Sequence, residues 1–271
     1  MNLKTRTPKG LYLKKEEDIK KMIEGGKKLV EILFEIKEKI KPGTKAEDLD
    51  KLAEELILKT GGRPAFKGYK PFFAKKPFPS SICFSKNEIV VHGIPKGFVE
   101  YSDIIKIDIG MIWENLYLDC AITVGIEPLS DEDKNLIKAT LEALKKAIDV
   151  FVFGNKLGEV GFVIEKTIKS FGFKPIYNLC GHGVGYNLHE EPEVLNFGQK
   201  NKGVTITSGL VVAIEPMASK TEIALENKDE SFRTQDGSRS SHFEATVGIL
   251  KEKTVVITDV IRDFEDFLIK V

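Results

Sequence analysis

The chain has 271 residues, of which 42% are hydrophobic, enough for one large domain or two small domains with a buried core. Its 41 basic residues equal its 41 acidic residues, so the composition gives no reason to expect a surface that binds DNA or another nucleic acid. The N-terminus lacks a signal-peptide core and no run approaches about 18 apolar residues, which predicts a soluble, cytoplasmic protein that does not enter membranes.

The beginning of the chain is rich in lysine. We expect a solvated tail over residues 1–12, followed by a helix face and a single domain over residues 13–271. A weak contact of this segment with ribosomal RNA stays open. The lysines concerned are Lys4, Lys9, Lys14, Lys15, Lys20 and Lys21.

Apolar residues at helical spacing predict two pairs of helices. The first helix, over residues 13–40, ends at Lys41-Pro42-Gly43. The second begins with a capping box at Thr44–Glu47 and ends near Gly61-Gly62. The second pair covers residues 131–151, with Ser130 as the N-cap, and residues 157–171, with Gly172 as the C-cap.

Each helix pair is followed by segments with strand character. A hairpin turn is expected at residues 113–115, an ordered loop at 63–80 that lines a site, and a polar loop at 219–240. The expected strands cover residues 81–84, 87–95, 104–110, 116–124, 209–215, 241–250 and 254–261. The elements therefore predict an α+β protein.

Four acidic residues interrupt these apolar strands: Asp108, Asp119, Glu215 and Glu244. A buried carboxylate is costly unless it is paired or binds a metal. Any one of the four could pair with a lysine or cap a turn, but Lys106 is the only obvious basic partner in a strand. Clustered carboxylates repel one another, and divalent cations remove that repulsion. Together with His182, the four acids form a mixed oxygen and nitrogen set that can hold two metal ions about 3.5–4 Å apart.

The two halves of the chain also echo each other. Asp108 and Glu215 each end an apolar segment that begins with serine, and Asp119 and Glu244 each precede a Thr-Val-Gly-Ile sequence. This echo indicates two similar halves that face one another across one sheet.

Two of the four histidines, His182 and His189, lie seven residues apart in the stretch 180–192. Three glycines in this stretch, at positions 181, 183 and 185, are expected to keep a turn open because glycine tolerates positive φ. Such a loop suits a metal ion or a small polar substrate. The alternative is that the two histidines form ordinary hydrogen bonds on a mobile loop.

Five motifs, taken together and in this order, resemble the methionine aminopeptidases of type I. They are Asn87–Pro95 with His92, the eleven-residue spacing of Asp108 and Asp119, Gly181–Gly185 with His189–Pro192, Ile214–Met217, and Ser241–Glu244. The resemblance runs from about residue 13 to 262. It implies the pita-bread fold, in which a curved antiparallel sheet is backed by two helix pairs related by a pseudo-twofold axis.

The resemblance also implies residue roles. Asp108 chelates one metal, Asp119 and Glu244 bridge both, and His182 and Glu215 complete the shell of the other. His92 and His189 face the substrate without binding metal. The implied reaction is hydrolytic removal of the N-terminal methionine from new polypeptides, preferring a small second residue, with Glu215 as general base. The cofactors would be two divalent ions of cobalt, manganese, iron or zinc, and the protein is expected to be a monomer.

By the same resemblance, Phe78 and Cys83 line the pocket for the methionine side chain, with Leu188 nearby. Leu188 and the segment Gly68–Lys76 depart from the family pattern, which leaves the pocket shape open. His242 replaces a common glutamine and is expected to be structural, close to Glu244.

Two alternatives remain at this stage. The first is an X-Pro aminopeptidase of the same fold, although these usually carry an additional N-terminal domain for which this chain has no room. The second is a non-catalytic pita-bread module that binds protein or RNA, although such modules lose ligand residues that are all present here.

Overall fold

The computed structural model describes residues 5–6, 10–70 and 74–270. Most of the tail expected over residues 1–12, and residues 71–73 of the expected loop, lie outside this description. Four α-helices are described: α1 (Glu16–Lys37), α2 (Ala46–Lys59), α3 (Asp131–Val150) and α4 (Leu157–Ser170). Among the described residues, no helix combines the length and apolar character that crossing a lipid bilayer requires.

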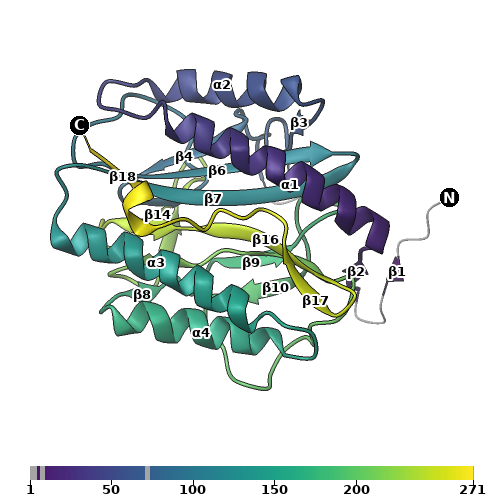
Figure 1. Cartoon of the computed structure of the whole chain (residues 1–271). Helices are drawn as coiled ribbons and strands as arrows, with labels where there is room; N and C mark the ends of the chain where they lie inside the picture. The colour runs from purple at the N-terminus through teal and green to yellow at the C-terminus, as the bar shows by residue number, and fades with distance from the viewer. Residues whose placement is uncertain (1–4, 7–9, 71–73, 271) are drawn as a thin grey trace.

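A ten-stranded sheet forms the centre of the molecule (Figure 1). Its main path runs in the order β10-β9-β11-β16-β7-β6-β3, and β17, β18 and β4 pair with β16, β7 and β6. All its pairs are antiparallel except β18 with β7. Its strands are β3 (Arg63–Pro64), β4 (Ile82–Lys86), β6 (Ile104–Trp113), β7 (Leu116–Ile126), β9 (Cys180–Gly183), β10 (Glu190–Leu195), β11 (Val211–Ile214), β16 (Glu244–Leu250), β17 (Lys253–Val256) and β18 (Leu268–Ile269).

The remaining strands form small sheets at the margins. Two three-stranded sheets have the orders β15-β12-β8 and β13-β14-β5, and β1 pairs with β2. These strands are β1 (Thr5–Arg6), β2 (Tyr12–Leu13), β5 (Ile89–Val91), β8 (Lys174–Pro175), β12 (Met217–Ser219), β13 (Ala224–Glu226), β14 (Phe232–Thr234) and β15 (Ser240–His242); a 3-10 helix, η1, covers Phe264–Phe267.

The expected similarity of the two halves is visible in the sheet. The hairpin β6–β7 belongs to the first half, the antiparallel pair β11–β16 belongs to the second, and β7 pairs with β16 between them. One helix pair covers each half, α1 and α2 over the first and α3 and α4 over the second (Figure 1). This is the curved antiparallel sheet with two helix pairs that the sequence predicted.

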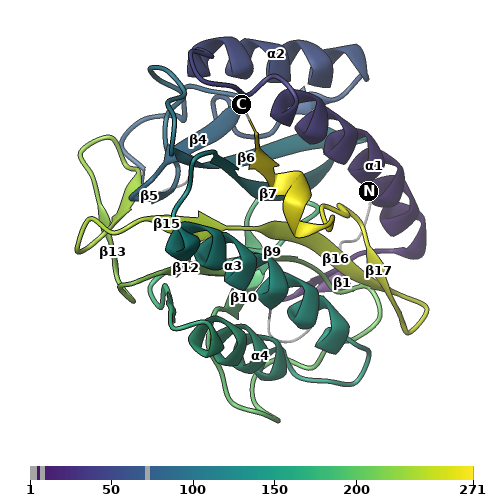
Figure 2. The same ribbon diagram turned by 60° about the vertical axis from the view of Figure 1, so that its left-hand side comes forward.

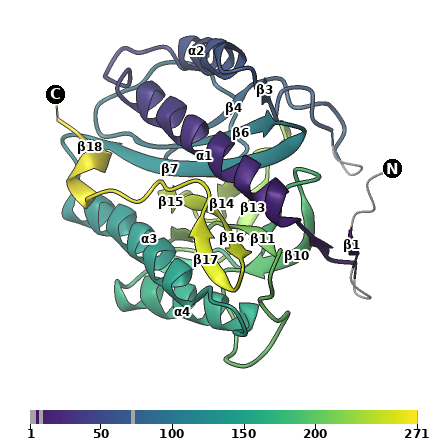
Figure 3. The same ribbon diagram turned by 45° about the vertical axis from the view of Figure 1, so that its right-hand side comes forward.

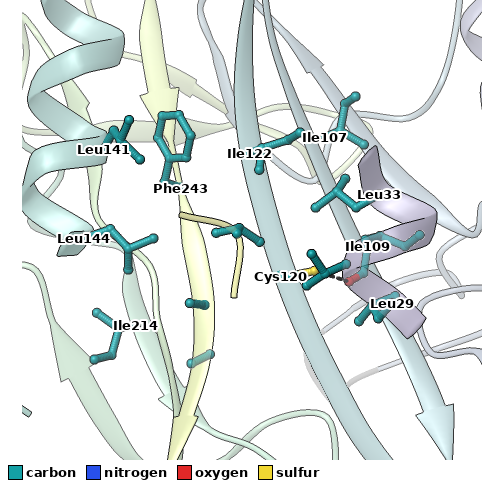
Figure 4. Close-up of a cluster of buried hydrophobic side chains, with 14 of the residues drawn as sticks. Leu29, Leu33, Ile107, Ile109, Cys120, Ile122, Leu141, Leu144, Ile214 and Phe243 are labelled. Carbon is teal, nitrogen blue, oxygen red and sulfur yellow. Dashed lines mark hydrogen bonds between the residues drawn. The ribbon is translucent and has the colours of Figure 1, made fainter. Parts of the chain in front are cut away.

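Apolar side chains between the helices and the sheet form the main core. In Figure 4, Leu29 and Leu33 of α1 face Ile107 and Ile109 of β6, while Leu141 and Leu144 of α3 lie on the side of Phe243 and Ile214, in the second half of the chain. All eight of these side chains are fully buried. Because this face of the strands is fully apolar, the acids of the same strands point to the opposite face.

Two of the predicted helix caps are confirmed, and a third is wrong. Ser130 Oγ accepts a hydrogen bond from the backbone N–H of Asp133, as predicted, and Gly172 takes a φ of +85° after α4. The prediction of a capping box at Thr44 was wrong. The N-cap of α2 is Lys45, and the Thr44 hydroxyl instead bonds the backbone of Lys39 and Lys41, closing the preceding turn.

Two strand predictions need correction. The polar loop expected over 219–240 contains the hairpin β13–β14, which pairs with β5 at the margin seen in Figure 2. The strand expected over 241–250 is divided at Phe243, because β15 pairs with β12 whereas β16 pairs with β11 and β7. The chain therefore changes sheets at Phe243, one residue before Glu244.

The expected solvated lysine face also needs correction at one position. Lys14 follows β2 at the end of the N-terminal segment, which approaches α1 and β10 in Figure 3. Its side chain is buried and forms an ion pair with Glu190. The sequence did not predict this burial, because nothing in the local pattern distinguishes Lys14 from Lys15.

Candidate metal centre

The four strand acids come from four neighbouring strands. Asp108 lies on β6 and Asp119 on β7, Glu215 follows the last residue of β11, and Glu244 begins β16. Asp108 is paired across the sheet with Ala121, and so is Glu244 on the other side of β7. Residues directly opposite each other in a ladder point to the same face. The pairing therefore brings Asp108 and Glu244 to the face on which Asp119 also lies.

His182 of β9 completes a cluster with these acids. Ligand atoms of Asp119, His182 and Glu244 all lie within 4.8 Å of one another. His182 Nε2 is 3.6 Å from Glu215 Oε1. Four of the five residues predicted as ligands are thus brought to one place: Asp119, His182, Glu215 and Glu244.

The contacts of Asp108 connect it to the same group. Burial raises the pKa of Asp108 from its ordinary value of 3.8 to about 7, while hydrogen bonds with Asp119 and Cys83 act in the opposite direction. Asp108 is therefore next to Asp119.

The other carboxylates raise one another's pKa. Burial, and then the charges of Glu244 and Asp108, raise the pKa of Asp119 well above its usual range. Burial followed by neighbouring carboxylates does the same for Glu215 and Glu244. Mutually repelling acids in a buried space are stable as anions only when a cation joins them.

Several polar atoms in this space have no partner in the described part of the chain. They are Asp108 Oδ1, Asp119 Oδ1, Glu244 Oε1 and both ring nitrogens of His242. Buried polar atoms are normally satisfied, so unsatisfied oxygens converging on one point indicate a missing ligand. The oxygen-rich set with one imidazole suits hard or borderline divalent metals.

His182 is held in the form that a metal ligand needs. Its Nδ1 is 3.0 Å from the carbonyl oxygen of Gly183. Because a carbonyl only accepts, Nδ1 must carry the ring proton, which leaves the lone pair of Nε2 directed at the acids. Burial lowers the pKa of His182 to about 4, so the ring is neutral at physiological pH.

The glycines of the histidine stretch act differently from the prediction. Only Gly185 has a positive φ, and Gly181 and Gly183 lie in strand β9. A Cβ on Gly181 would lie 2.3 Å from the carbonyl oxygen of Ala213, and one on Gly183 would lie 2.4 Å from that of Glu191. These glycines therefore allow the neighbouring strands to approach His182 closely.

His189 lies beside His182, with ring centroids 4.4 Å apart and nearly perpendicular planes. Its Nδ1 is 3.0 Å from the hydroxyl of Tyr69, a residue that the sequence reasoning did not single out. Burial lowers the pKa of His189 to about 3, so the ring is neutral. Since the Tyr69 hydroxyl can donate to Nδ1, we assign the ring proton to Nε2.

His92 follows β5 with a φ of 60°, which is unusual for a residue with a side chain and costs backbone strain. Its ring packs edge-on against Phe232, at 5.7 Å between centroids. Burial lowers the pKa of His92, and a hydrogen bond to the backbone of Glu230 opposes that shift. The hairpin β13–β14, which the sequence did not predict, thus holds His92 through Phe232.

A small hydrophobic cluster lies next to Asp108. Cys83 of β4 is directly opposite Asp108 in the ladder, and it packs with Phe78 and Leu188. The other members are Ala65, Phe66, Tyr69, Ile112 and Tyr117. The three residues predicted to line an apolar pocket are therefore together.

Comparisons with known proteins agree with this geometry. Residues 20–259 match the family described as metallopeptidase family M24. The methionine aminopeptidase of Aquifex aeolicus is 39% identical over 257 residues, covering 92% of this chain and 99% of that protein. The crystal structure of methionine aminopeptidase from Thermotoga maritima superimposes with a TM-score of 0.86 at 36% identity, covering 92% of this chain and 99% of that one. The chain belongs to the methionine aminopeptidases.

Prolidases share the fold at a greater distance. Prolidase from Pyrococcus furiosus superimposes with a TM-score of 0.74 at 20% identity, and the match covers 66% of that chain. Identity at this level shows a common fold alone. The similarity to methionine aminopeptidases is higher on every one of these measures.

Two further residues, Tyr69 and His242, also lie beside this cluster. Tyr69 was missed, although the loop that contains it was expected to line a site. His242 is almost fully buried, and its Nε2 lies 3.7 Å from Glu215 Oε2 and 3.8 Å from Glu244 Oε2. The expected position of His242 close to Glu244 is therefore confirmed.

Proposed function

We propose that the protein removes the N-terminal methionine from newly made polypeptides, with two divalent metal ions held by Asp108, Asp119, His182, Glu215 and Glu244. One observation carries this proposal: the buried carboxylates of Asp119 and Glu244, each with an oxygen that lacks a partner in the described part of the chain, have ligand atoms within 4.8 Å of His182. Membership of the methionine aminopeptidases supplies the reaction class.

The residues have complementary roles in holding the metals. Asp119 and Glu244 lie centrally, where two carboxylate oxygens each could serve both ions. Asp108 on one side and His182 with Glu215 on the other would complete the two shells. When bound, divalent ions of manganese, iron, cobalt or zinc supply Lewis-acid polarisation of the scissile carbonyl and a water of lowered pKa.

Glu215 is our proposed general base. Its pKa is raised, first by burial and then by the charges of Asp108 and Asp119, so its carboxylate has increased proton affinity. A base must accept the proton of the attacking water and later release it to the leaving amine. The position of Glu215 directly beside His182 and His242 keeps the carboxylate inside the site.

His189 is our proposed donor to the developing oxyanion. The Tyr69 hydroxyl bonded to Nδ1 leaves Nε2–H of the neutral ring free to donate a hydrogen bond. His92, held by its strained backbone and by Phe232, would contact the scissile amide nitrogen and help the amine leave.

The substrate side chain is expected in the cluster around Phe78, Cys83 and Leu188. These groups are apolar, which suits the flexible thioether of methionine, and Cys83 adjoins Asp108. A substrate methionine in this cluster would place its α-amino group near the acids. That placement explains why only chain ends would be cut.

We also propose that the protein acts in the cytoplasm as a monomer on nascent chains. The three cysteines are unpaired, as expected in a reducing compartment. A weak ribosome contact remains an expectation from the lysine-rich start. The non-catalytic module is disfavoured because all five ligand residues are present and clustered.

The proposal is tested by stripping the metal with a chelator and returning it stepwise while turnover of Met-Ala, Met-Gly and Met-Leu peptides is measured. We expect activity to require two ions per chain and to favour small second residues. Asp119→Asn should abolish both metal binding and turnover. The matched control is Asp103→Asn, which alters another buried acid, ion-paired with Lys86 at 2.7 Å, and should retain metal. Full turnover by the metal-free protein would refute the proposal.

A further inference from the structure

The loop between His182 and His189 is closed by a charged residue from the beginning of the chain. Lys14 and Glu190 form an ion pair whose side chains are 1% and 0% exposed. Such a pair is costly to break, because removal of one partner leaves an uncompensated buried charge. The pair lies outside the proposed metal ligands, and the reaction does not use it.

Glu190 fixes the end of the loop that carries His189. One carboxylate oxygen binds Lys14, and the other accepts a hydrogen bond of 2.7 Å from the backbone N–H of Asn187. The backbone of Glu190 is paired with Gly183, next to His182. The carboxylate therefore ties the chain two residues before His189 to the residue directly after it.

Lys14 fixes the middle of the same loop. Its Cε lies so close to Gly185 that a Cβ on this glycine would be 2.3 Å away. Its Nζ also donates to the carbonyl of Tyr12, at 2.9 Å, and its backbone N–H donates to Gly209, at 2.7 Å. Backbone hydrogen bonds thus hold Lys14 in place, and its side chain extends along the loop past Gly185 to Glu190.

These contacts connect the N-terminal segment to the spacing of the two histidines. His182 and His189 lie at the two ends of the loop, and their rings are 4.4 Å apart. From these contacts we propose that Lys14 and Glu190 are positioning residues, which hold His189 against His182 in the geometry needed for turnover. The inference rests on the role of His189 proposed above.

The test compares Lys14→Met with a matched control, Lys20→Met, in the full chain loaded with manganese. Lys20 forms an exposed ion pair with Glu16, at 2.8 Å, on the first turns of α1. For Lys14→Met we expect kcat on Met-Ala-Ser to fall roughly 10- to 100-fold, the scale of an ångström-size misplacement, with KM and metal content near wild type. Lys20→Met should match wild type in all three.

The His189→Ala background separates positioning from general weakening. If Lys14 acts through His189, Lys14→Met causes no further loss of kcat once His189 is absent, because coupled residues are not additive. In the metal-free protein, amide exchange in residues 183–190 should become faster for Lys14→Met and stay unchanged for Lys20→Met. The double variant Lys14→Met/Glu190→Gln removes both charges of this pair. It replaces Lys14→Met in these experiments if the single variant does not fold.

The outcomes distinguish this inference from the proposed function. An inactive wild-type protein with bound metal would overturn the proposed function. An active wild type that loses turnover with His189→Ala, but keeps it with Lys14→Met or the double variant, would overturn the positioning role alone. An equal loss of kcat from the lysine change with and without His189 would also overturn it.

Discussion

The pH dependence of metal-free stability follows from Asp108. Its pKa rises from 3.8 to about 7 on folding, chiefly through burial. The folded protein therefore binds a proton more tightly than the unfolded chain, so this group stabilises the fold below pH 4. That stabilisation is lost as the pH rises to about 7.

The perturbation that isolates this effect is Asp108→Asn, which keeps the shape and removes the charge. One pKa unit corresponds to about 1.4 kcal/mol, so ionised Asp108 costs the metal-free fold roughly 4 kcal/mol at pH 8. For a chain of this size, that corresponds to a difference in Tm on the order of 10 °C. The variant should therefore be about as stable as wild type at pH 4 and clearly more stable at pH 8.

Calorimetry in the presence of a chelator, at pH values from 4 to 8, measures the difference in Tm. Comparison of the two proteins removes the contribution of the histidines, whose lowered pKa values act in the opposite direction in both. With manganese in place of the chelator, wild type should have the higher Tm, because it binds the ion more tightly and is therefore stabilised more. A difference in Tm that is constant from pH 4 to pH 8 would refute the reasoning.

Three further predictions concern single side chains. Glu215→Gln should lower kcat roughly 10²- to 10⁴-fold in steady-state assays on Met-Ala peptides, the range for loss of a general base, and a kcat near wild type contradicts that role. Tyr69→Phe should lower kcat about fivefold, because one hydrogen bond of about 1 kcal/mol to His189 is lost, and an effect on KM alone would speak against it. Ser130→Ala should lower the free energy of unfolding in urea by about 1 kcal/mol and leave turnover unchanged, because it removes the N-cap of α3. An unchanged urea midpoint would contradict the role of Ser130 as a cap.

Local chemistry predicted much of the fold. Periodicity predicted all four helices. The acids inside apolar strands predicted a cluster of carboxylates, because a charged residue within an apolar strand is conspicuous in sequence. The cap at Ser130 was correct, whereas that at Thr44 was wrong, because both serine and threonine suit turns as well as helix starts. The division at Phe243 depends on which strands lie alongside, which no local pattern contains.

Long-range contacts explain what the sequence did not reveal in the site. Tyr69 and His189 are 120 residues apart, and Lys14 and Glu190 are 176 apart. Each pair forms only when the sheet brings distant segments together. Lys14 resembles its solvated neighbours in every local respect, so only the tertiary fold reveals that its side chain is buried.

The most direct test of the central claim is anomalous diffraction at the manganese edge from crystals equilibrated with Mn²⁺. We expect two peaks about 3.5–4 Å apart, both in contact with the carboxylates of Asp119 and Glu244. One peak should adjoin Asp108 and the other His182. Diffraction without any peak between these side chains, or with the ions bound elsewhere on the protein, would contradict the account.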